Sequence, residues 1–170
     1  MTHYIRVFVL AAIGCSVLPG QAPSVPAQWE GVWTLSLAES TFGPILTPGF
    51  PNGLTVTSET LRFTVSAGEL KGAGDTVTTQ FGSSHDGFEV RLDGKETKRV
   101  LAPGATISTR LVDDATFVIT IKVDRDGVGV NRFVLDGKKL TETKTHTESK
   151  REGAKTSTSI LVFYKTPGSK

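Results

Sequence analysis

Hydrophobic and polar residues alternate along most of the chain after residue 27. The clearest case runs from Ala115 to Val123, where the apolar positions Phe117, Ile119, Ile121 and Val123 recur at every second residue. A period of two places these side chains on one face of a β-strand. We expect this apolar face to point inward and the opposite face, with Thr116, Thr120 and Lys122, to meet solvent.

The same alternation, interrupted by residues that reverse the chain, predicts a series of short strands. They are 31–37, 54–65 (with a break near Ser58 left open), 76–81, 88–92, 97–101, 106–112, 115–123, 128–135, 139–147 and 156–165. The turns between them include Gly72 to Asp75, Gly82 to Gly87, Asp93-Gly94 and Asp136-Gly137. A twisted sheet of this size tends to close and so lose its edges. The sequence therefore predicts an all-β fold, an antiparallel up-and-down β-barrel of about 8–10 strands.

The segment from Ala38 to Gly53 interrupts the strand pattern. Pro44, Pro48 and Pro51 remove backbone donors, so the segment can be neither a helix nor a central strand. It also carries four apolar side chains, Phe42, Ile45, Leu46 and Phe50. Two interpretations stay open: a flap over an opening of the barrel, and a loop pinned to the outside of the core.

Residues 1–27 differ from the rest of the chain and indicate an export signal followed by a tether. The apolar run from Val7 to Ile13 is shorter than the ~20 apolar residues that cross a bilayer. Two processing routes stay open: a lipobox-like sequence that would attach a lipid at Cys15, and cleavage after Ala27. The barrel domain would then span 28–170, without a transmembrane segment. We expect an exported protein, either a lipoprotein of the periplasm or outer membrane or a secreted protein.

Length and composition fit one globular domain that folds without disulfides. The chain has 170 residues, of which 38% are hydrophobic and 21% charged, and its single cysteine is Cys15. Lys and Arg number 19 against 17 Asp and Glu, for a formal net charge of +2. So small a net charge indicates no nucleic-acid partner.

The sequence carries no motif of a catalytic or metal site. Only two histidines, His85 and His146, follow residue 27, and the patterns HExxH, CxxC and GxSxG do not occur. These patterns mark common zinc, redox and hydrolase sites. We therefore expect no catalytic residue, no metal and no cofactor, and a protein that is not an enzyme.

Three short motifs carry a family resemblance: Gly31-x-Trp33 at the opening, the Asp-Gly hairpins, and the closing run Val162-Phe163-Tyr164-Lys165. With them the chain resembles the calycin group of lipocalins and fatty-acid-binding proteins, and is most similar to lipocalin-like proteins exported by bacteria. The resemblance implies a lipocalin-like barrel. It also implies that Arg132 and Tyr164 face inward, as the Arg and Tyr that hold a ligand carboxylate in fatty-acid-binding proteins do.

Two departures from the fatty-acid-binding pattern bear on the ligand. Val162 stands where that family has a second inward Arg, and the Pro-rich loop 38–53 stands in place of a helical lid. The resemblance therefore implies the barrel more strongly than it implies a fatty-acid ligand.

The strand 128–135 leaves the direction of Arg132 open. Its alternate neighbours Val128, Val130 and Val134 are apolar, so that face can be the inward one. An Arg inside would need a partner, either an anionic ligand or Glu142 on the next strand. In the alternative interpretation Phe133 and Leu135 face inward and Arg132 lies in solvent.

We predict that the protein binds a small lipophilic or amphipathic molecule inside the barrel, without catalysis. The predicted ligand contacts are Arg132, Tyr164, Phe117, Ile119, Ile121 and Leu35, and Trp33 is predicted to form the floor of the barrel. One alternative is an envelope structural or interaction module whose barrel is filled by its own side chains. The other is an enzyme on the same fold, for which the fold alone is no argument.

Overall fold

The computed structural model describes residues 25–43, 55–66, 69–90, 93–98, 105–123, 127–148 and 155–168. These residues form a short 3-10 helix and ten strands. The elements are η1 (Ala27–Trp29), β1 (Gly31–Leu35), β2 (Val56–Ser66), β3 (Glu69–Thr78), β4 (Gly82–Val90), β5 (Asp93–Lys98), β6 (Ala105–Asp113), β7 (Thr116–Val123), β8 (Gly127–Asp136), β9 (Lys139–Thr147) and β10 (Thr156–Lys165). Cys15 and the rest of the predicted export signal before residue 25 lie outside the described residues.

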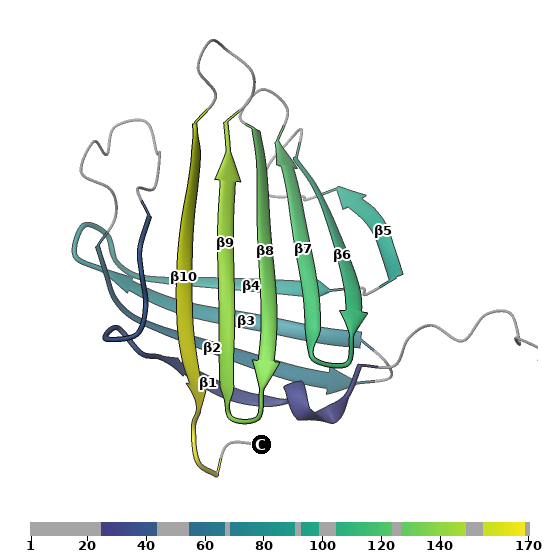
Figure 1. The fold of residues 1–170 in the computed structure, drawn as a ribbon, viewed down its shortest axis with the longest axis horizontal. Coiled ribbons are helices and arrows are strands. Elements are labelled where there is room, and N and C mark those ends of the chain that lie inside the picture. Colours follow the sequence, from purple (N-terminus) through teal and green to yellow (C-terminus); the bar gives the residue numbers. More distant parts are fainter. Residues whose placement is uncertain are drawn as a thin grey trace, which may run out of the picture.

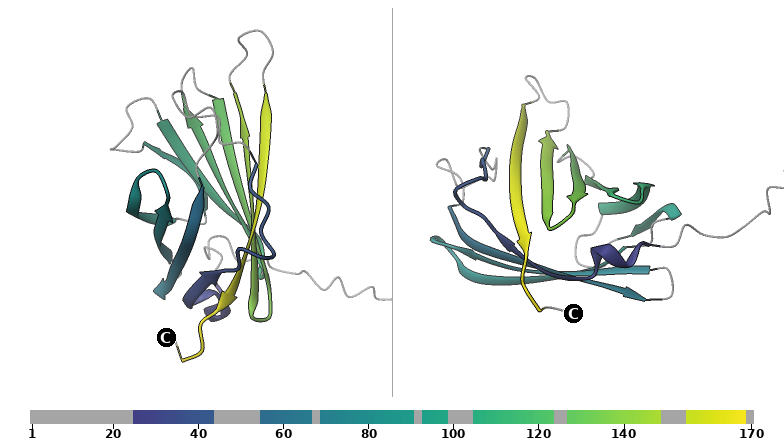
Figure 2. Two further views of the ribbon diagram at one scale, coloured as in Figure 1. Left: turned by 90° about the vertical axis from the view of Figure 1, so that its left-hand side faces the viewer. Right: turned by 60° about the horizontal axis from the view of Figure 1, so that its bottom comes forward.

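All ten strands belong to one antiparallel sheet in the order β4-β3-β2-β1-β10-β9-β8-β7-β6-β5. Each strand is therefore paired with its neighbours in sequence, except that β4 and β5 are the two edges of the strand order, and the first strand, β1, is paired with the last, β10 (Figure 1). The sheet curls so that β1–β4 cross behind β6–β10 in the view of Figure 1, and the turned views of Figure 2 show the same curl from the side and from below. This arrangement confirms the predicted up-and-down barrel. No helix in the described part of the chain is long and apolar enough to cross a membrane.

The strands of the second half follow the predicted alternation, and β9 and β10 have the predicted bounds. In the first half three predicted turns are wrong. The residues Gly72 to Asp75 lie inside β3, the residues Gly82 to Gly87 begin β4, and Asp93-Gly94 begins β5, while the turn after β3 is Thr79 to Phe81. Glycine favours turns locally, but here the backbone of β3 is paired on both sides, by β2 and β4, and this pairing outweighs the local preference.

A cluster of four aromatic rings holds the two halves of the curled sheet together. Phe117 of β7 stacks on Phe133 of β8, with ring centroids 4.4 Å apart. Phe63 of β2 meets both rings edge to face, at 5.9 and 6.2 Å. Trp29 of η1 packs against Phe117 at 4.8 Å. Such pairs contribute about 0.5–1.5 kcal/mol each beyond the apolar area they bury.

Trp33 of β1 is wholly buried. Its indole Nε1 donates to the carbonyl of Trp29 at 3.2 Å, and Lys165 Nζ lies 5.4 Å from its ring centroid. Trp29 in turn donates from Nε1 to the carbonyl of Asp114, in the turn between β6 and β7, at 3.0 Å. The two tryptophans together close this end of the interior.

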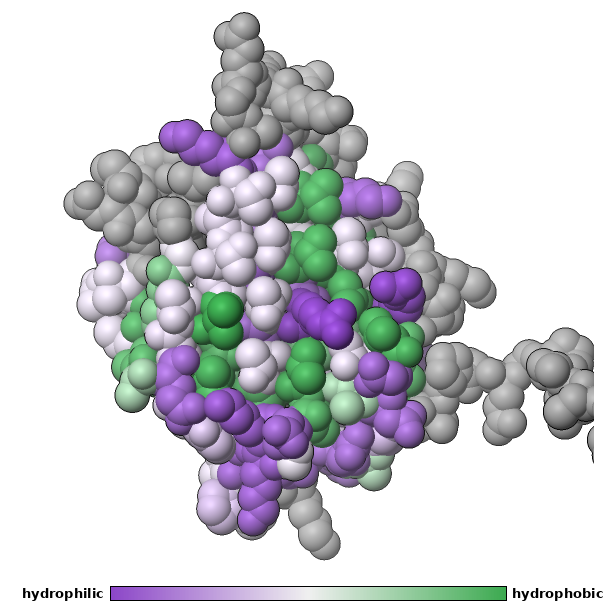
Figure 3. Space-filling view, in the orientation of Figure 1, coloured by the Kyte–Doolittle hydropathy of each residue, from purple (hydrophilic) through white to green (hydrophobic). Residues whose placement is uncertain are grey.

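The outward faces of the strands carry a mixture of side chains. Over β6–β10, hydrophobic and hydrophilic residues are interleaved (Figure 3). The larger exposed apolar residues on these strands are Val112, Val128, Ile160 and Tyr164. The outward faces of these strands are therefore not purely polar, whereas the inward faces are mostly apolar.

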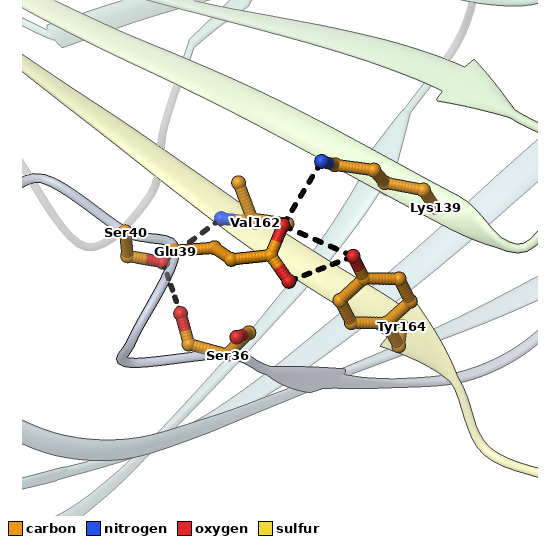
Figure 4. A network of polar contacts seen from close by, with 6 residues as sticks. All are labelled: Ser36, Glu39, Ser40, Lys139, Val162 and Tyr164. Atoms are coloured by element: carbon orange, nitrogen blue, oxygen red, sulfur yellow. Dashed lines mark hydrogen bonds and ion pairs between the residues drawn. The ribbon is translucent and has the colours of Figure 1, made fainter.

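The first strand ends earlier than predicted. β1 stops at Leu35, and Leu37, the last residue of the predicted strand 31–37, is 46% exposed because a turn covers 37–39. Ser40 closes this turn: its hydroxyl donates to the carbonyl of Ser36 at 2.7 Å and accepts the Val162 N–H at 3.0 Å (Figure 4). Thr41 then pairs with Ile160 of β10. The first residues of the Pro-rich loop thus lie along β10, in agreement with the pinned-loop interpretation, while residues 44–53 lie outside the described part of the chain.

We expect Ser40→Ala to lower the free energy of unfolding by about 1–3 kcal/mol, because the buried Val162 N–H would lose its acceptor. Urea unfolding followed by tryptophan fluorescence measures the change. Ser40→Thr keeps a hydroxyl and serves as the control. Equal stability of Ser40→Ala and the wild type would contradict a structural role for this hydrogen bond.

Candidate functional site

The interior contains a partly open pocket of about 180 Å³ beside the aromatic cluster. Side chains from β2, β3 and β6 to β9 surround it, so both halves of the curled sheet contribute. Its lining residues are Glu59, Leu61, Gly74, Thr76, Ile107, Ile119, Ile121, Asn131, Phe133, Glu142 and Lys144. Apolar and polar residues are thus both present.

The apolar part of the pocket follows from the alternation of the strands. Ile119 and Ile121 share the inward face of β7, and Ile107 of β6 packs beside them. Phe133 belongs both to this wall and to the aromatic cluster. On β3, Gly74 is buried and lines the pocket without a side chain of its own. The pocket therefore exists partly because a glycine occupies an inward position.

The polar part is a group of two buried carboxylates and one partly exposed ammonium. Lys144 Nζ of β9 lies 3.3 Å from Glu59 Oε1 of β2 and 3.4 Å from Glu142 Oε2 of β9. The side chains of Glu59 and Glu142 are 6% and 2% exposed, whereas that of Lys144 is 38% exposed. Asn131 of β8 donates from Nδ2 to Glu142 Oε1 at 3.0 Å. The ion pair with Glu59 crosses the interior from one half of the sheet to the other.

Glu142 is the least satisfied member of this group. Its Oε2 is buried and accepts no hydrogen bond from the described residues. Burial raises the pKa of Glu142 to about 7, with the nearby charge of Glu59 acting in the same direction and Lys144 and Asn131 opposing it. Burial also acts to lower the pKa of Lys144, but the charges of Glu142 and Glu59 outweigh it and hold that pKa above its usual value.

The predicted apolar contacts are divided between two places in the interior. Ile119 and Ile121 line the pocket. Phe117 is fully buried, but it belongs to the aromatic cluster and not to the pocket lining. Leu35 is partly buried and packs against the core, also apart from the pocket lining.

The inward placement of Arg132 and Tyr164 that the family resemblance implied is wrong; of the two directions left open for Arg132, the structure has the one toward solvent. Arg132 is exposed on the outer face of β8, and its neighbours Phe133 and Leu135 point inward. An aromatic and a leucine side chain gain more from burial than the valines of the other face, and an inward Arg would need a counter-charge. Glu142 pairs with Phe133 across the ladder, so it faces the interior while Arg132 faces solvent.

Tyr164 lies outside the barrel and is 41% exposed. Its hydroxyl donates to both carboxylate oxygens of Glu39, at 2.8 and 3.0 Å, and Lys139 Nζ contacts the same carboxylate at 3.0 Å (Figure 4). These hydrogen bonds, from Tyr164 first and then Lys139, lower the pKa of Glu39. Tyr164 therefore helps to fasten the turn after β1 to β9 and β10.

Glu59, Asn131 and Lys144 were not predicted as site residues, and Glu142 was predicted only as a possible partner of Arg132. A signal was present in β9, where Thr141, Thr143 and Thr145 alternate with larger residues. The period of two places Glu142 and Lys144 on the face of the buried Leu140. Charged residues on the apolar face of a strand indicate a polar site in the interior.

Solved structures with a similar fold match most of this chain. Secretory abundant heat soluble protein 4 from Ramazzottius varieornatus aligns with a TM-score of 0.52 and 14% identity, covering 84% of this chain and 97% of that one. A point mutant of the fluorescent protein UnaG aligns with a TM-score of 0.51 and 15% identity, covering 82% of this chain and 97% of that one. No protein-family model and no curated protein sequence matches the chain. At these identities the likeness establishes the fold alone, an antiparallel β-barrel.

We expect the stability of the protein to fall as the pH rises from about 4.5 to about 7, because the folded chain keeps the proton of Glu142 over this range and the unfolded chain does not. The unfolded chain releases that proton near pH 4.5, so between these values the folded state binds more protons and each rise in pH destabilises it. The shift in the pKa of Glu142 corresponds to a loss of at most roughly 3 kcal/mol in the free energy of unfolding between pH 5 and pH 8. Urea unfolding at a series of pH values measures it.

Glu142→Gln should flatten this dependence, because the glutamine side chain has no titratable proton. In the control Glu39→Gln the slope should persist, since the pKa of Glu39 lies below this pH range. An unchanged slope in Glu142→Gln would show that Glu142 does not titrate near pH 7.

Proposed function

We propose that this protein is an exported β-barrel that binds a small amphipathic molecule in its interior pocket and does not alter it chemically. The pocket is the observation that carries the proposal. Protein interiors are close-packed, with few voids larger than a water molecule. A void of about 180 Å³ between the halves of a barrel is far larger, and this supports a space kept for a ligand.

The volume limits the size of the buried part of the ligand. A cavity of about 150 Å³ binds benzene, and pockets for drug-sized ligands measure about 300–1,000 Å³. The pocket of about 180 Å³ therefore suits a ring or a short branched chain, with the rest of a larger molecule extending through the open side. A fully enclosed long acyl chain would not fit.

The lining supports an amphipathic ligand. Ile107, Ile119, Ile121, Leu61 and Phe133 form an apolar wall, on which burial contributes about 25 cal/mol per Å² before the entropy of fixing the ligand is subtracted. The charged group at the other side of the pocket orients a polar end.

Export is supported by the sequence of residues 1–27, with lipid attachment at Cys15 and cleavage after Ala27 as the two routes. One of the structural neighbours is itself named as a secretory protein. Binding without catalysis is the simpler function for this pocket, since the polar groups present, two carboxylates, an ammonium and an amide, are engaged with one another.

The aromatic end of the interior favours the alternative, a structural or interaction module with a filled barrel. Trp29, Trp33, Phe63, Phe117 and Phe163 are almost wholly buried and pack this end densely. Such packing stabilises the barrel without binding anything. Ligand binding differs from this alternative in requiring the pocket, so a variant that fills the pocket separates the two.

We expect Gly74→Val to abolish binding of 2-phenylethanol, a neutral probe with a ring that suits the pocket, because the valine side chain would occupy the pocket volume. Valine is compatible with a strand, and Gly74 is not among the glycines with positive φ. Isothermal titration calorimetry measures the binding. Ala73→Val, which adds bulk on the opposite face of β3, is the matched control and should bind like the wild type.

Native mass spectrometry of protein purified from its own source adds an independent test. We expect a bound small molecule in the wild type and none in Gly74→Val. A wild-type protein that carries no ligand and does not bind the neutral probe would favour the filled-barrel alternative.

A further inference from the structure

We propose that the ligand carries a protonated amine, and that Glu142 together with Glu59 receives it at the polar side of the pocket. This inference rests on the proposed binding function and specifies the chemical class of the ligand. It is carried by the geometry of the buried carboxylates and by the balance of donors and acceptors around them.

When Glu142 is ionised, the charges in the pocket lining do not cancel. Glu59 and Glu142 then bring two negative charges, and Lys144 is the one cationic side chain among the described residues of the lining. Lys144 lies between them, at 3.3 Å from Glu59 and 3.4 Å from Glu142, so one ammonium serves two acids. A buried charge without full compensation is unfavourable. A second cation in the pocket would restore neutrality.

The hydrogen bonds show the same imbalance. Asn131 Nδ2 is used on Glu142 Oε1, and Lys144 Nζ donates to Glu59 Oε1. The remaining oxygen, Glu142 Oε2, lines the same pocket on a side chain only 2% exposed. Lys144 Nζ, which Glu59 shares, lies 3.4 Å from it as an ion pair, and no donor among the described residues meets it in hydrogen-bond geometry. What this oxygen lacks is a well-aligned donor. A ligand ammonium has three donors and no acceptor, which matches the deficit.

An anionic ligand fits this arrangement poorly. A carboxylate in the pocket would meet Glu59 and Glu142 at close range, while Lys144 is already shared between those two acids. Arg132 and Tyr164, the groups that would hold a fatty-acid carboxylate, are both exposed on the outside. The pocket therefore selects a cation in preference to an anion of the same shape.

The apolar wall defines the rest of the molecule. Ile107, Ile119 and Ile121 face the same pocket as the carboxylates, and its volume of about 180 Å³ accepts a group of about the size of a benzene ring. The inferred ligand class is a small primary amine on a compact apolar group, such as an arylalkylamine.

Three probes of nearly equal shape test this inference: 2-phenylethylamine, 2-phenylethanol and 3-phenylpropionate, which carry a cationic, a neutral and an anionic end. Isothermal titration calorimetry at pH 8, where Glu142 is mostly ionised, measures their affinities. We expect the affinity for the amine to be at least about tenfold higher than that for the alcohol, since a charged hydrogen bond contributes more than a neutral one. The carboxylate should bind most weakly of the three.

Two variants change the amine-to-alcohol affinity ratio in opposite directions. Glu142→Gln removes one carboxylate charge and should reduce the ratio toward one. Lys144→Met removes the competing ammonium and should increase it. Because loss of folding cannot increase the ratio, the second variant remains informative even if the first is unstable. Glu69→Gln removes an exposed carboxylate outside the pocket and should leave the ratio unchanged.

The outcomes separate this inference from the proposed function. If 3-phenylpropionate binds as tightly as the amine, or if Glu142→Gln leaves the ratio unchanged, the amine inference is overturned while binding in the pocket stands. If none of the three probes binds to the folded wild type, the amine inference and the proposed binding function both fail.

Discussion

The interlocking of four aromatic rings is the interaction on which the rest of the structure depends. Phe63 lies in the half of the sheet formed by β1–β4, and Phe117 and Phe133 lie in the half formed by β6–β10. Their contacts hold the two halves at a fixed distance at one end of the interior. Further along the same strands the inward residues are smaller or polar. Because the two halves of the sheet stay apart there, these residues do not fill the space between them and leave a pocket.

The residues that line the pocket contribute less to stability than the apolar side chains of a filled barrel would. Inward positions that a purely structural barrel would fill with apolar side chains are occupied by Gly74, Glu59 and Glu142. Replacing buried ion pairs by well-packed apolar residues is often neutral or stabilising, so a buried group of charges is weak evidence of a contribution to stability. The aromatic end offsets such a loss, because the burial of large rings is among the strongest contributions to folding. One end of the barrel thus supplies stability and the other supplies a binding site.

The exterior contact between Glu39, Tyr164 and Lys139 has a different consequence. It fastens the turn after β1 to β9 and β10, where Ser40 also continues the hydrogen bonding of the β1–β10 ladder (Figure 4). This is the seam where the first and last strands meet. A tyrosine that the family resemblance placed inside as a ligand contact is instead part of the seam, since its position in β10 alternates with the buried Phe163.

The sequence by itself determined the fold class, the strands of the second half and the burial of Trp33, because a period of two residues and tight Asp-Gly turns act locally. It also determined that Ile119 and Ile121 face inward. Only the tertiary structure decided the direction of Arg132, since both faces of β8 carry apolar residues and the choice depends on what lies opposite. The same is true of Gly72 to Asp75, which form a strand because β2 and β4 pair with them on both sides. The pocket could not be predicted from local pattern, because Glu59 and Lys144 are 85 residues apart in sequence and meet only when the sheet curls.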